Sequence, residues 1–471
     1  MLTSHVNGRT LNLFRMRNLR GWAIYEWALL TLSAGLVIWQ LFVPPSLGVA
    51  DNNDYAKLIG RVCLGGEHPL FEYVGFEYHY APEYCWNSGL ITSAVLPLRF
   101  ALAMVKPFSA GRFDVRWLGA VYGVLFLLSF AGVQRLVRGL RPMARLLVPA
   151  AILAVFCGAT YIPWFDSFYF DTASYVFLWC ACLLCLRLLL RGTVTTWDYL
   201  AALACVVVFE TSKSQHTALA LPLIACFWLP LGRAGFPRLP LRAAATVVVV
   251  TAAVVMFASA PPWYQTVNSY NALFYQSLIH SPDPAGDLAQ LGMDPGMARY
   301  VGKHAFLPDS PMQDARETER LGRFLSVRSL AVYYLSHPRI AALVFRSALA
   351  EGSLQRVRMQ IGARQYRLGN YEITAGKGPE AQSHFFDFWG GLKARVFGNR
   401  PVLYGFYGAG LLAALWVLCV RARVAAIAAI WTTMVVLAAV LVMFDGVDTG
   451  RHLFLFNAML DMTACGLLCF L

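Results

Sequence analysis

Repeated apolar runs, each close to the length of a membrane-spanning helix, constrain this sequence more than any other feature. A helix needs about 20 apolar residues to cross the hydrocarbon core of a bilayer, and a helix satisfies all of its own backbone polar groups there. Hydrophobic residues make up 58% of the chain and charged residues only 14%. Soluble domains carry about 25% charged residues. The sequence therefore predicts an all-α polytopic membrane protein.

The net charge of +13 does not indicate a nucleic-acid partner. The arginines lie in short clusters between apolar runs, as the positive-inside rule requires of cytoplasmic loops. Arg135, Arg138, Arg141 and Arg145 share one such connection, and the segment 1–21 holds four more arginines ahead of the first apolar run. Both segments are predicted to be cytoplasmic. The partner that the charge pattern indicates is the lipid bilayer, and no nucleic acid is expected.

Alternation of the apolar runs predicts about ten transmembrane helices with both ends of the chain in the cytoplasm. The segment before the last three spans is polar and aromatic enough to fold as an outer domain, and long loops escape the positive-inside rule. The predicted parts are a cytoplasmic N-terminus at 1–21, a transmembrane core at 22–260 with its first outer loop at 44–116, a large mixed outer loop domain at 261–400, and C-terminal transmembrane helices at 401–471 that begin with a span at 402–420.

One apolar stretch, 90–105, is not predicted to cross the membrane. It is short and contains Pro97 and Arg99. If it crossed, the loop with four arginines would lie outside, against the positive-inside rule. We therefore expect a re-entrant or juxtamembrane helix within the first outer loop.

Cys63 and Cys85 are set apart from the other cysteines, which fall inside apolar runs. Both lie in the first outer loop, which in this topology faces an oxidising compartment. We therefore predict a disulfide between Cys63 and Cys85. No spacing of Cys and His resembles a zinc site.

Polar residues gather at the predicted outer ends of the spans. Any one of them is explained equally well as an interfacial cap or a snorkelling charge. As a set they favour function, because the inner loops hold arginine clusters without carboxylates. The set consists of Asp51 and Asp54 in the first outer loop, Asp166 and Asp171 in an aromatic run, Lys213 and Gln215 in a short hairpin, and Asp445, Arg451 and His452 before the last span.

This combination suits the transfer of a sugar from a lipid phosphate to a hydroxyl group. Such a reaction needs a carboxylate to accept the proton of the acceptor and cations to stabilise the departing phosphate. Asp51 and Asp54 can supply the carboxylate, while Asp166 and Asp171 can orient the sugar or the acceptor. The cations are Lys213, Arg451 and His452.

The motif Asp51-x-x-x-Tyr55-Ala56 resembles the first-loop acidic motif of the GT-C superfamily, the membrane glycosyltransferases that use polyprenyl-linked sugar donors. The stretch 90–105 is similar to their juxtamembrane segment. The motifs Trp164–Asp171, Lys213-x-Gln215 and Arg451-His452-Leu453 resemble those of a bacterial branch that includes hexose transferases of cell-surface glycan assembly.

The resemblance implies a polyprenyl-phosphate-sugar donor and a glycan, lipid or protein acceptor. It adds Tyr55 and Gln215 to the substrate-binding residues, and it implies a multi-pass protein of the bacterial inner membrane whose site faces the periplasm or the exterior. The sequence departs from the family at Asn52, where relatives commonly have Glu, and at Asp166, where they often have Asn. These departures leave the catalytic carboxylate and any need for a divalent metal open, and no cofactor is indicated.

Asp51 is preferred over Asp54 as the base because its spacing to Tyr55 matches the GT-C pattern. A carboxylate beside Lys57 and Arg61 is expected to stay ionised near neutral pH. The alternative is a transporter or flippase for a lipid-linked glycan, which would show repeated halves and ionisable residues at mid-membrane. No internal repeat is evident, and the ionisable residues are predicted at span ends. A scaffold without enzymatic activity would need no converging polar loops.

Overall fold

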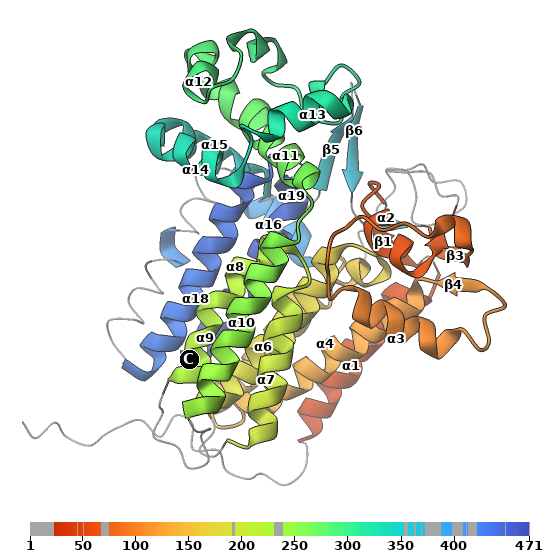
Figure 1. Ribbon diagram of the computed structural model, residues 1–471. Helices are drawn as coiled ribbons and strands as arrows, with labels where there is room; N and C mark the ends of the chain where they lie inside the picture. The colour runs from red at the N-terminus through yellow and green to blue at the C-terminus, as the bar shows by residue number, and fades with distance from the viewer. Residues whose placement is uncertain are drawn as a thin grey trace, which may run out of the picture.

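The computed structural model is mostly helical, with the long helices side by side in one bundle and a smaller helical domain at one end of it (Figure 1). It describes residues 23–44, 46–49, 51–66, 75–190, 194–229, 239–352, 357–361, 364–368, 370–372, 388–397, 408–410, 412, 422–447 and 449–470. The predicted cytoplasmic segment 1–21 and nearly all of the predicted span 402–420 lie outside these residues.

Five helical segments of the described chain are long and apolar enough to span a membrane. Three further apolar helices are shorter. A polytopic helical membrane protein is therefore confirmed, although the described helices do not establish ten spans. The five are α1 (Ile24–Phe42), α4 (Arg116–Val137), α6 (Phe170–Leu190), α10 (Leu239–Ala258) and the segment Ala425–Phe444. The last segment consists of most of α18 (Ala422–Leu441) and the whole of η10 (Val442–Phe444). The shorter helices are α3 (Val95–Val105), α5 (Pro142–Phe156) and α20 (Phe454–Leu467).

The apolar segment after Gln215 is not one continuous helix. It is interrupted near Pro222, which has no backbone N–H to donate to the preceding turn. Before it, α7 (Thr196–Glu210) packs along α6. The pieces are η4 (Ser214–His216), α8 (Thr217–Ala220), η5 (Leu221–Leu223) and α9 (Ile224–Trp228).

Helix α3 has the form expected of a surface helix. Its 11 residues reach about 16 Å, roughly half of the hydrocarbon thickness. Leu98 and Leu102 are buried against the rest of the protein, whereas Leu96, Phe100 and Met104 are at least half exposed along the other side. An apolar face of this kind, on a helix too short to cross, suits a position in the membrane interface.

The segment 44–116, predicted as the first outer loop, also contains short strands, a departure from an all-α fold. It holds α2 (Ala56–Ile59), η1 (Gly60–Val62) and η2 (Pro82–Tyr84). Cys63 and Cys85 form a disulfide within it. Its strand β1 (Leu47–Val49) pairs antiparallel with β7 (Asn370–Glu372), and β2 (Leu64–Gly65), β3 (Glu77–Tyr80) and β4 (Arg112–Asp114) form an antiparallel sheet. Another hairpin pairs β5 (Val357–Ile361) with β6 (Arg364–Leu368).

The domain at the end of the bundle has its own hydrophobic core, built around Phe274, Leu288 and Tyr333. Its helix α15 (Pro338–Gly352) contacts α18, η10 and α19 (Thr449–His452) at the end of the bundle. The other elements of the domain are α11 (Pro262–Tyr270), the π-helical turn η6 (Asn271–Ser277), η7 (Leu278–His280), α12 (Pro284–Gln290), η8 (Pro295–Tyr300), η9 (Pro311–Gln313), α13 (Ala315–Gly322) and α14 (Val327–Ser336), followed by α15 (Pro338–Gly352).

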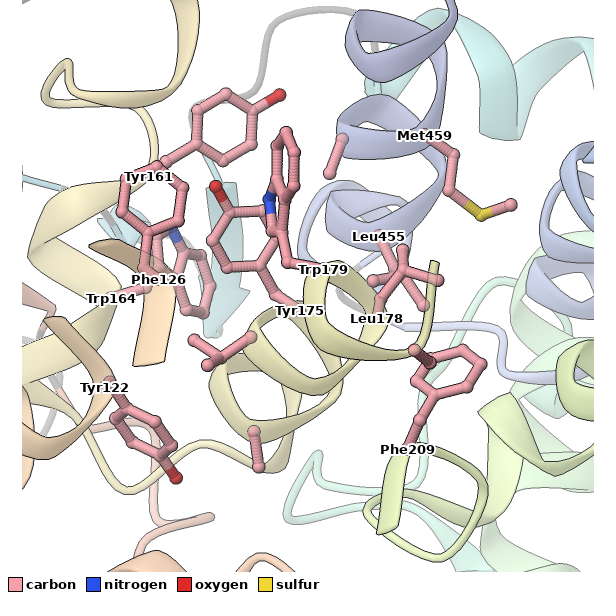
Figure 2. Close-up of a cluster of buried hydrophobic side chains, with 14 of the residues drawn as sticks. Tyr122, Phe126, Tyr161, Trp164, Tyr175, Leu178, Trp179, Phe209, Leu455 and Met459 are labelled. Carbon is pink, nitrogen blue, oxygen red and sulfur yellow. The ribbon is translucent and has the colours of Figure 1, made fainter. Parts of the chain in front are cut away.

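Aromatic side chains fill the core where α4, α6 and α20 meet the turn η3 (Ile162–Asp166) (Figure 2). Tyr161 stacks on Tyr175 with ring centroids 5.4 Å apart, and Trp164 lies 4.5 Å from Phe454. Such rings bury a large apolar area and interlock in fixed orientations. The aromatic run predicted from the sequence is therefore mainly a packing element, and it fixes the point at which α6 begins.

One ionisable residue lies inside an apolar helix, so the expectation that all such residues sit at span ends is wrong. Asp461 in α20 is 2% exposed. Its carboxylate accepts hydrogen bonds from Lys393 Nζ at 2.9 and 3.1 Å, from Trp389 Nε1 at 2.8 Å and from Tyr161 OH at 2.5 Å. Lys393 and Trp389 belong to α16 (Phe388–Phe397), which this pair therefore attaches to the bundle.

Candidate active site

Arg451 lies at the centre of a charged cluster where the bundle meets the outer elements. One of its guanidinium nitrogens is 2.7 Å from Asp54 Oδ2, and the other is 3.5 Å from Asp171 Oδ2. The guanidinium also lies over the ring of Tyr169, 4.9 Å from the centroid. A buried guanidinium needs such partners, since its charge cannot be removed by deprotonation. Three segments that are distant in sequence are thereby joined.

Lys213 adds a second cation to the same carboxylate. Its Nζ is 2.8 Å from Asp171 Oδ1 and 3.1 Å from His452 Nδ1, and the residue is only 4% exposed. Asp171 stands in the first turn of α6, where the helix dipole favours a negative charge. Asp171 therefore holds Lys213 and Arg451 side by side.

His452 is held from the other side by Asp445 and Gln215. Its Nδ1 lies 2.7 Å from Asp445 Oδ2 and 3.0 Å from Gln215 Oε1, and the Gln215 amide also donates to Asp445. Burial acts to raise the pKa of Asp445, but the neighbouring His452 and Lys213 outweigh it and the pKa lies below its usual value. Asp445 is thus an ionised partner for His452.

Asp54 is neutralised by two cations. It forms ion pairs with Lys57, one turn later in α2, and with Arg451. Burial opposes ionisation, but these two charges outweigh it and hold the pKa of Asp54 far below its usual value. A carboxylate bound in this way has low basicity and is suited to positioning cations.

Asp51 differs from Asp54, because the two cations expected to keep it ionised bind other groups. Lys57 pairs with Asp54, while Arg61 reaches Asn87 at 3.4 Å. Within the described residues Asp51 forms no ion pair, and its Oδ1 accepts a hydrogen bond from the Tyr55 backbone at 3.2 Å. Burial, together with the charge of Asp54, raises the pKa of Asp51 to about 7. General bases work best when their pKa lies near the working pH.

Tyr55 anchors the loop of Asp51 to the aromatic core. Its ring is 2% exposed and packs edge-on against Phe168 and Tyr169, and its hydroxyl donates to the Val49 carbonyl at 2.7 Å. The Asn52 backbone N–H donates to Tyr169 OH at 3.0 Å. The structure thus places Tyr55 in the core under the cluster, where it fixes the position of Asp51.

Asp166 is not brought into the cluster. Its side chain is buried against α4, so closely that a Cβ on Gly119 would lie 2.0 Å from Asp166 Oδ1. Among the described residues neither carboxylate oxygen has a hydrogen-bond partner, and burial raises its pKa well above the usual value. A protonated carboxyl in this position cannot serve as a base at neutral pH.

Tyr264 of α11 was not predicted as a site residue. Lys57 Nζ lies 5.3 Å from the centroid of its ring, so a residue of the outer domain borders the Asp54 ion pair. No local motif marks Tyr264 in the sequence, because its contacts come from elements that only the fold brings together. Among the described residues, no group of three or more His, Cys, Asp and Glu is placed to hold a metal ion.

The fold and this cluster define a multi-pass helical membrane protein with a charged site at one end of its bundle. The chain belongs to the YfdI family, since the family model for the YfdI N-terminal transmembrane domain matches residues 16–470. That match includes the bundle, the outer domain and the last helices alike. No curated protein and no solved structure matches the chain.

Proposed function

We propose that this protein is a membrane glycosyltransferase of the GT-C type, which moves a sugar from a polyprenyl-phosphate donor to a glycan, lipid or protein acceptor at the outer face of the membrane. One observation carries the proposal. Asp51 forms no ion pair among the described residues, yet it lies close enough to Asp54 and Arg451 to interact with their charges, and Asp171 joins Arg451 to Lys213, which contacts His452. A base beside a group of cations is what transfer from a lipid phosphate needs.

In this mechanism Asp51 accepts the proton of the acceptor hydroxyl while the hydroxyl oxygen bonds to the anomeric carbon. The bond between that carbon and the phosphate oxygen breaks, and its electron pair leaves with the polyprenyl phosphate. Lys213 and Arg451 stabilise the negative charge on the leaving oxygen, and His452 can donate a hydrogen bond to it. The proton ends on Asp51 and returns to solvent.

The carboxylates Asp54 and Asp171 keep the cations in position before the donor binds. Arg451 is shared between them, and Lys213 touches Asp171 alone. Phosphate oxygens accept the same charge-assisted hydrogen bonds from Arg and Lys that these carboxylates accept. Prearranged cations need no reorganisation when the charge of the leaving group develops, which is the condition for a large electrostatic contribution.

The site is assigned to the periplasmic or exterior side of a bacterial inner membrane. The disulfide between Cys63 and Cys85 lies in the same outer loop as Asp51, and disulfides persist in oxidising compartments. At the far end of α1 and α4, Arg138 pairs with Glu26 beside the loop that holds the arginine cluster. Arginine-rich loops face the cytoplasm.

The test is an assay of the purified protein in lipid nanodiscs. Polyprenyl phosphates that carry radiolabelled glucose, galactose or mannose are supplied together with a bacterial glycan and glycolipid extract as acceptor. We expect label to move from the donor to the acceptor while free polyprenyl phosphate accumulates. If reconstituted vesicles instead move intact lipid-linked sugar between leaflets, with no cleavage of the sugar–phosphate bond, the protein is a flippase and the proposal is wrong.

A further inference from the structure

The turn between η10 and α19 carries Asp445, and the outer domain packs tightly on this turn. Met443 is buried in the hydrophobic core of the outer domain, although it lies in the apolar segment Ala425–Phe444. Tyr334 of α14 donates a hydrogen bond from its hydroxyl to the Met443 carbonyl at 2.9 Å, and its ring packs edge-on against Phe444. The turn therefore belongs to the bundle and to the outer domain at once.

Gly446, in the same turn, makes a contact that no other residue allows. Its Cα faces the peptide bond between Asn271 and Ala272, so closely that a Cβ there would lie 2.2 Å from the Asn271 carbonyl carbon and 2.2 Å from the Ala272 nitrogen. These are backbone atoms, which cannot rotate aside as the end of a side chain can. The φ of Gly446 is +75°, in the left-handed region where a Cβ adds strain. Any side chain here therefore pushes the turn and the outer domain apart.

The surface that meets Gly446 is the start of the π-helical turn η6, which is firmly held. Asn271 is 1% exposed, and its side-chain Oδ1 accepts a hydrogen bond from the Ala305 backbone at 2.7 Å. Ala272 is buried in the core of the outer domain. Single π-helical turns occur frequently at functional sites. A methyl group added to Gly446 should therefore displace the turn that carries Asp445, while η6 stays in place.

The position of Asp445 determines the position of His452. Asp445 Oδ2 lies 2.7 Å from His452 Nδ1, and it also accepts a hydrogen bond from the Gln215 amide. The other two cations of the site have carboxylate partners that lie on different elements, at the start of α6 and just before α2. A shift of the turn should therefore affect His452 more than it affects the other two cations.

We infer that Gly446 is a positioning residue, through which the outer domain sets the place of Asp445 and thereby the orientation of His452. This inference rests on the proposed function, in which His452 donates a hydrogen bond to the leaving phosphate oxygen. The outer domain then influences turnover through the turn on which it packs, and it does so without contacting the phosphate.

The test compares Gly446→Ala with Gly292→Ala in purified protein. Gly292 also lies in the outer domain and has φ of +76°, but a Cβ there would meet only ring atoms of Phe324, at 3.5 and 3.6 Å. Both variants carry the same kind of backbone strain, and only Gly446→Ala collides with η6. We expect Gly446→Ala to lower kcat by about tenfold or more, the effect of one charge-assisted hydrogen bond, with KM for the donor within about threefold. Gly292→Ala should keep both parent values.

Three further measurements separate positioning from a general loss of structure. In a His452→Ala background, Gly446→Ala should cause no further loss of kcat, because the group through which it acts is absent, whereas independent effects would multiply. Carbethoxylation of histidines by diethyl pyrocarbonate, followed by peptide mass spectrometry, should show His452 reacting faster in Gly446→Ala than in the parent, with the exposed His79 as reference. Tyr334→Phe removes only the hydrogen bond to the Met443 carbonyl and should lower kcat by about threefold.

If Gly446→Ala turns over as fast as Gly292→Ala, Gly446 has no positioning role. The inference is equally wrong if the losses from His452→Ala and Gly446→Ala multiply, or if the reactivity of His452 stays at the parent value. If Gly446→Ala does not fold, Tyr334→Phe decides the question by the same three measurements. If the parent protein transfers no sugar, the proposed function fails, while faster labelling of His452 in Gly446→Ala would still establish that Gly446 positions it.

Discussion

Two groups of charged residues in the described part of the chain differ in how completely each carboxylate is satisfied. Inside the bundle, Asp461 accepts hydrogen bonds from Lys393, Trp389 and Tyr161, so both of its oxygens have partners. At the outer end, Asp54 is bound by two cations, but Asp51 beside it has none among the described residues.

A buried charge therefore does not by itself mark a functional site. A fully satisfied ion pair such as Asp461 with Lys393 fixes the position of one helix on another, and it is a weak argument for chemistry. A carboxylate that the fold leaves without a counter-charge costs folding free energy that a structural role does not require. Asp166 also lacks a counter-charge among the described residues, but it is fully buried and away from the cluster. Asp51 is partly exposed and interacts with the charges of Asp54 and Arg451, so it is the unpaired carboxylate that supports a functional role.

The largest expected effect is on turnover in Asp51→Asn. The amide keeps the size and hydrogen bonding of the carboxylate but cannot accept the proton. Since general-base catalysis contributes typically about 10²- to 10⁴-fold, kcat should fall by that factor. The measurement is single-turnover sugar transfer by purified protein. Asp309→Asn, at an exposed carboxylate in the outer domain, is the matched control and should keep the parent rate.

If Asp51→Asn transferred sugar at the parent rate, the unpaired carboxylate would have no catalytic role. The distinction between the two groups of charges would then be one of packing alone.

Asp461→Asn should affect stability and leave the chemistry intact. Removing one partner of a buried pair leaves Lys393 as an uncompensated charge, which costs about 3–5 kcal/mol of unfolding free energy. Thermal unfolding in detergent should show the loss, while turnover per folded molecule stays at the parent value. The double variant with Lys393→Met and Asp461→Leu replaces the pair by apolar groups and should recover most of the stability. Slow turnover in a stable Asp461→Asn protein would reverse the assigned roles.

The rate of transfer should depend on pH through Asp51. Its pKa is raised to about 7, so the basic form is present above that pH and is lost as the pH falls through it. The rate should therefore decrease about tenfold per unit below pH 7 and level off above it. Asp54, whose pKa is lowered, should add no inflection between pH 5 and 9. A parent profile that is flat from pH 5 to 8 would contradict this assignment.

The smallest effect is expected for Gln215→Met. The Gln215 amide contacts both Asp445 and His452, so its loss removes hydrogen bonds within the cluster but no charge. A net contribution of about 1 kcal/mol predicts a roughly fivefold change in KM for the donor. Gln290→Met, at an exposed position at the end of α12, should leave KM unchanged. A 100-fold loss in Gln215→Met would mean that this residue does more than position its neighbours.

Hydropathy predicted the bundle because the membrane imposes one strong rule on every span. The helices α1, α4, α6 and α10 could each be predicted from the length and hydropathy of their own segment, without reference to neighbouring segments. The same topology placed Asp54, Asp171, Lys213 and Arg451 at one membrane face, where the structure brings them together.

The sequence could not show how the charges pair within that face. Lys57 lies near both Asp51 and Asp54 in sequence, and only the turn of α2 decides that it binds Asp54. Asp461 was visible as a carboxylate in an apolar run, but its partner Lys393 lies in a segment with no recognisable motif. Tyr264 likewise depends on how the outer domain packs, which hydropathy does not record.

The ion pair between Asp54 and Arg451 joins residues about 400 positions apart in the chain. Such a contact closes a very long loop, so it forms late, and proteins that depend on distant contacts fold slowly. During synthesis Asp51 and Asp54 are made long before Arg451 and His452 exist. Under the proposed mechanism a growing chain therefore has its base and Lys213 before it has the other two cations of the site. Sugar transfer is then expected only after α19 has docked.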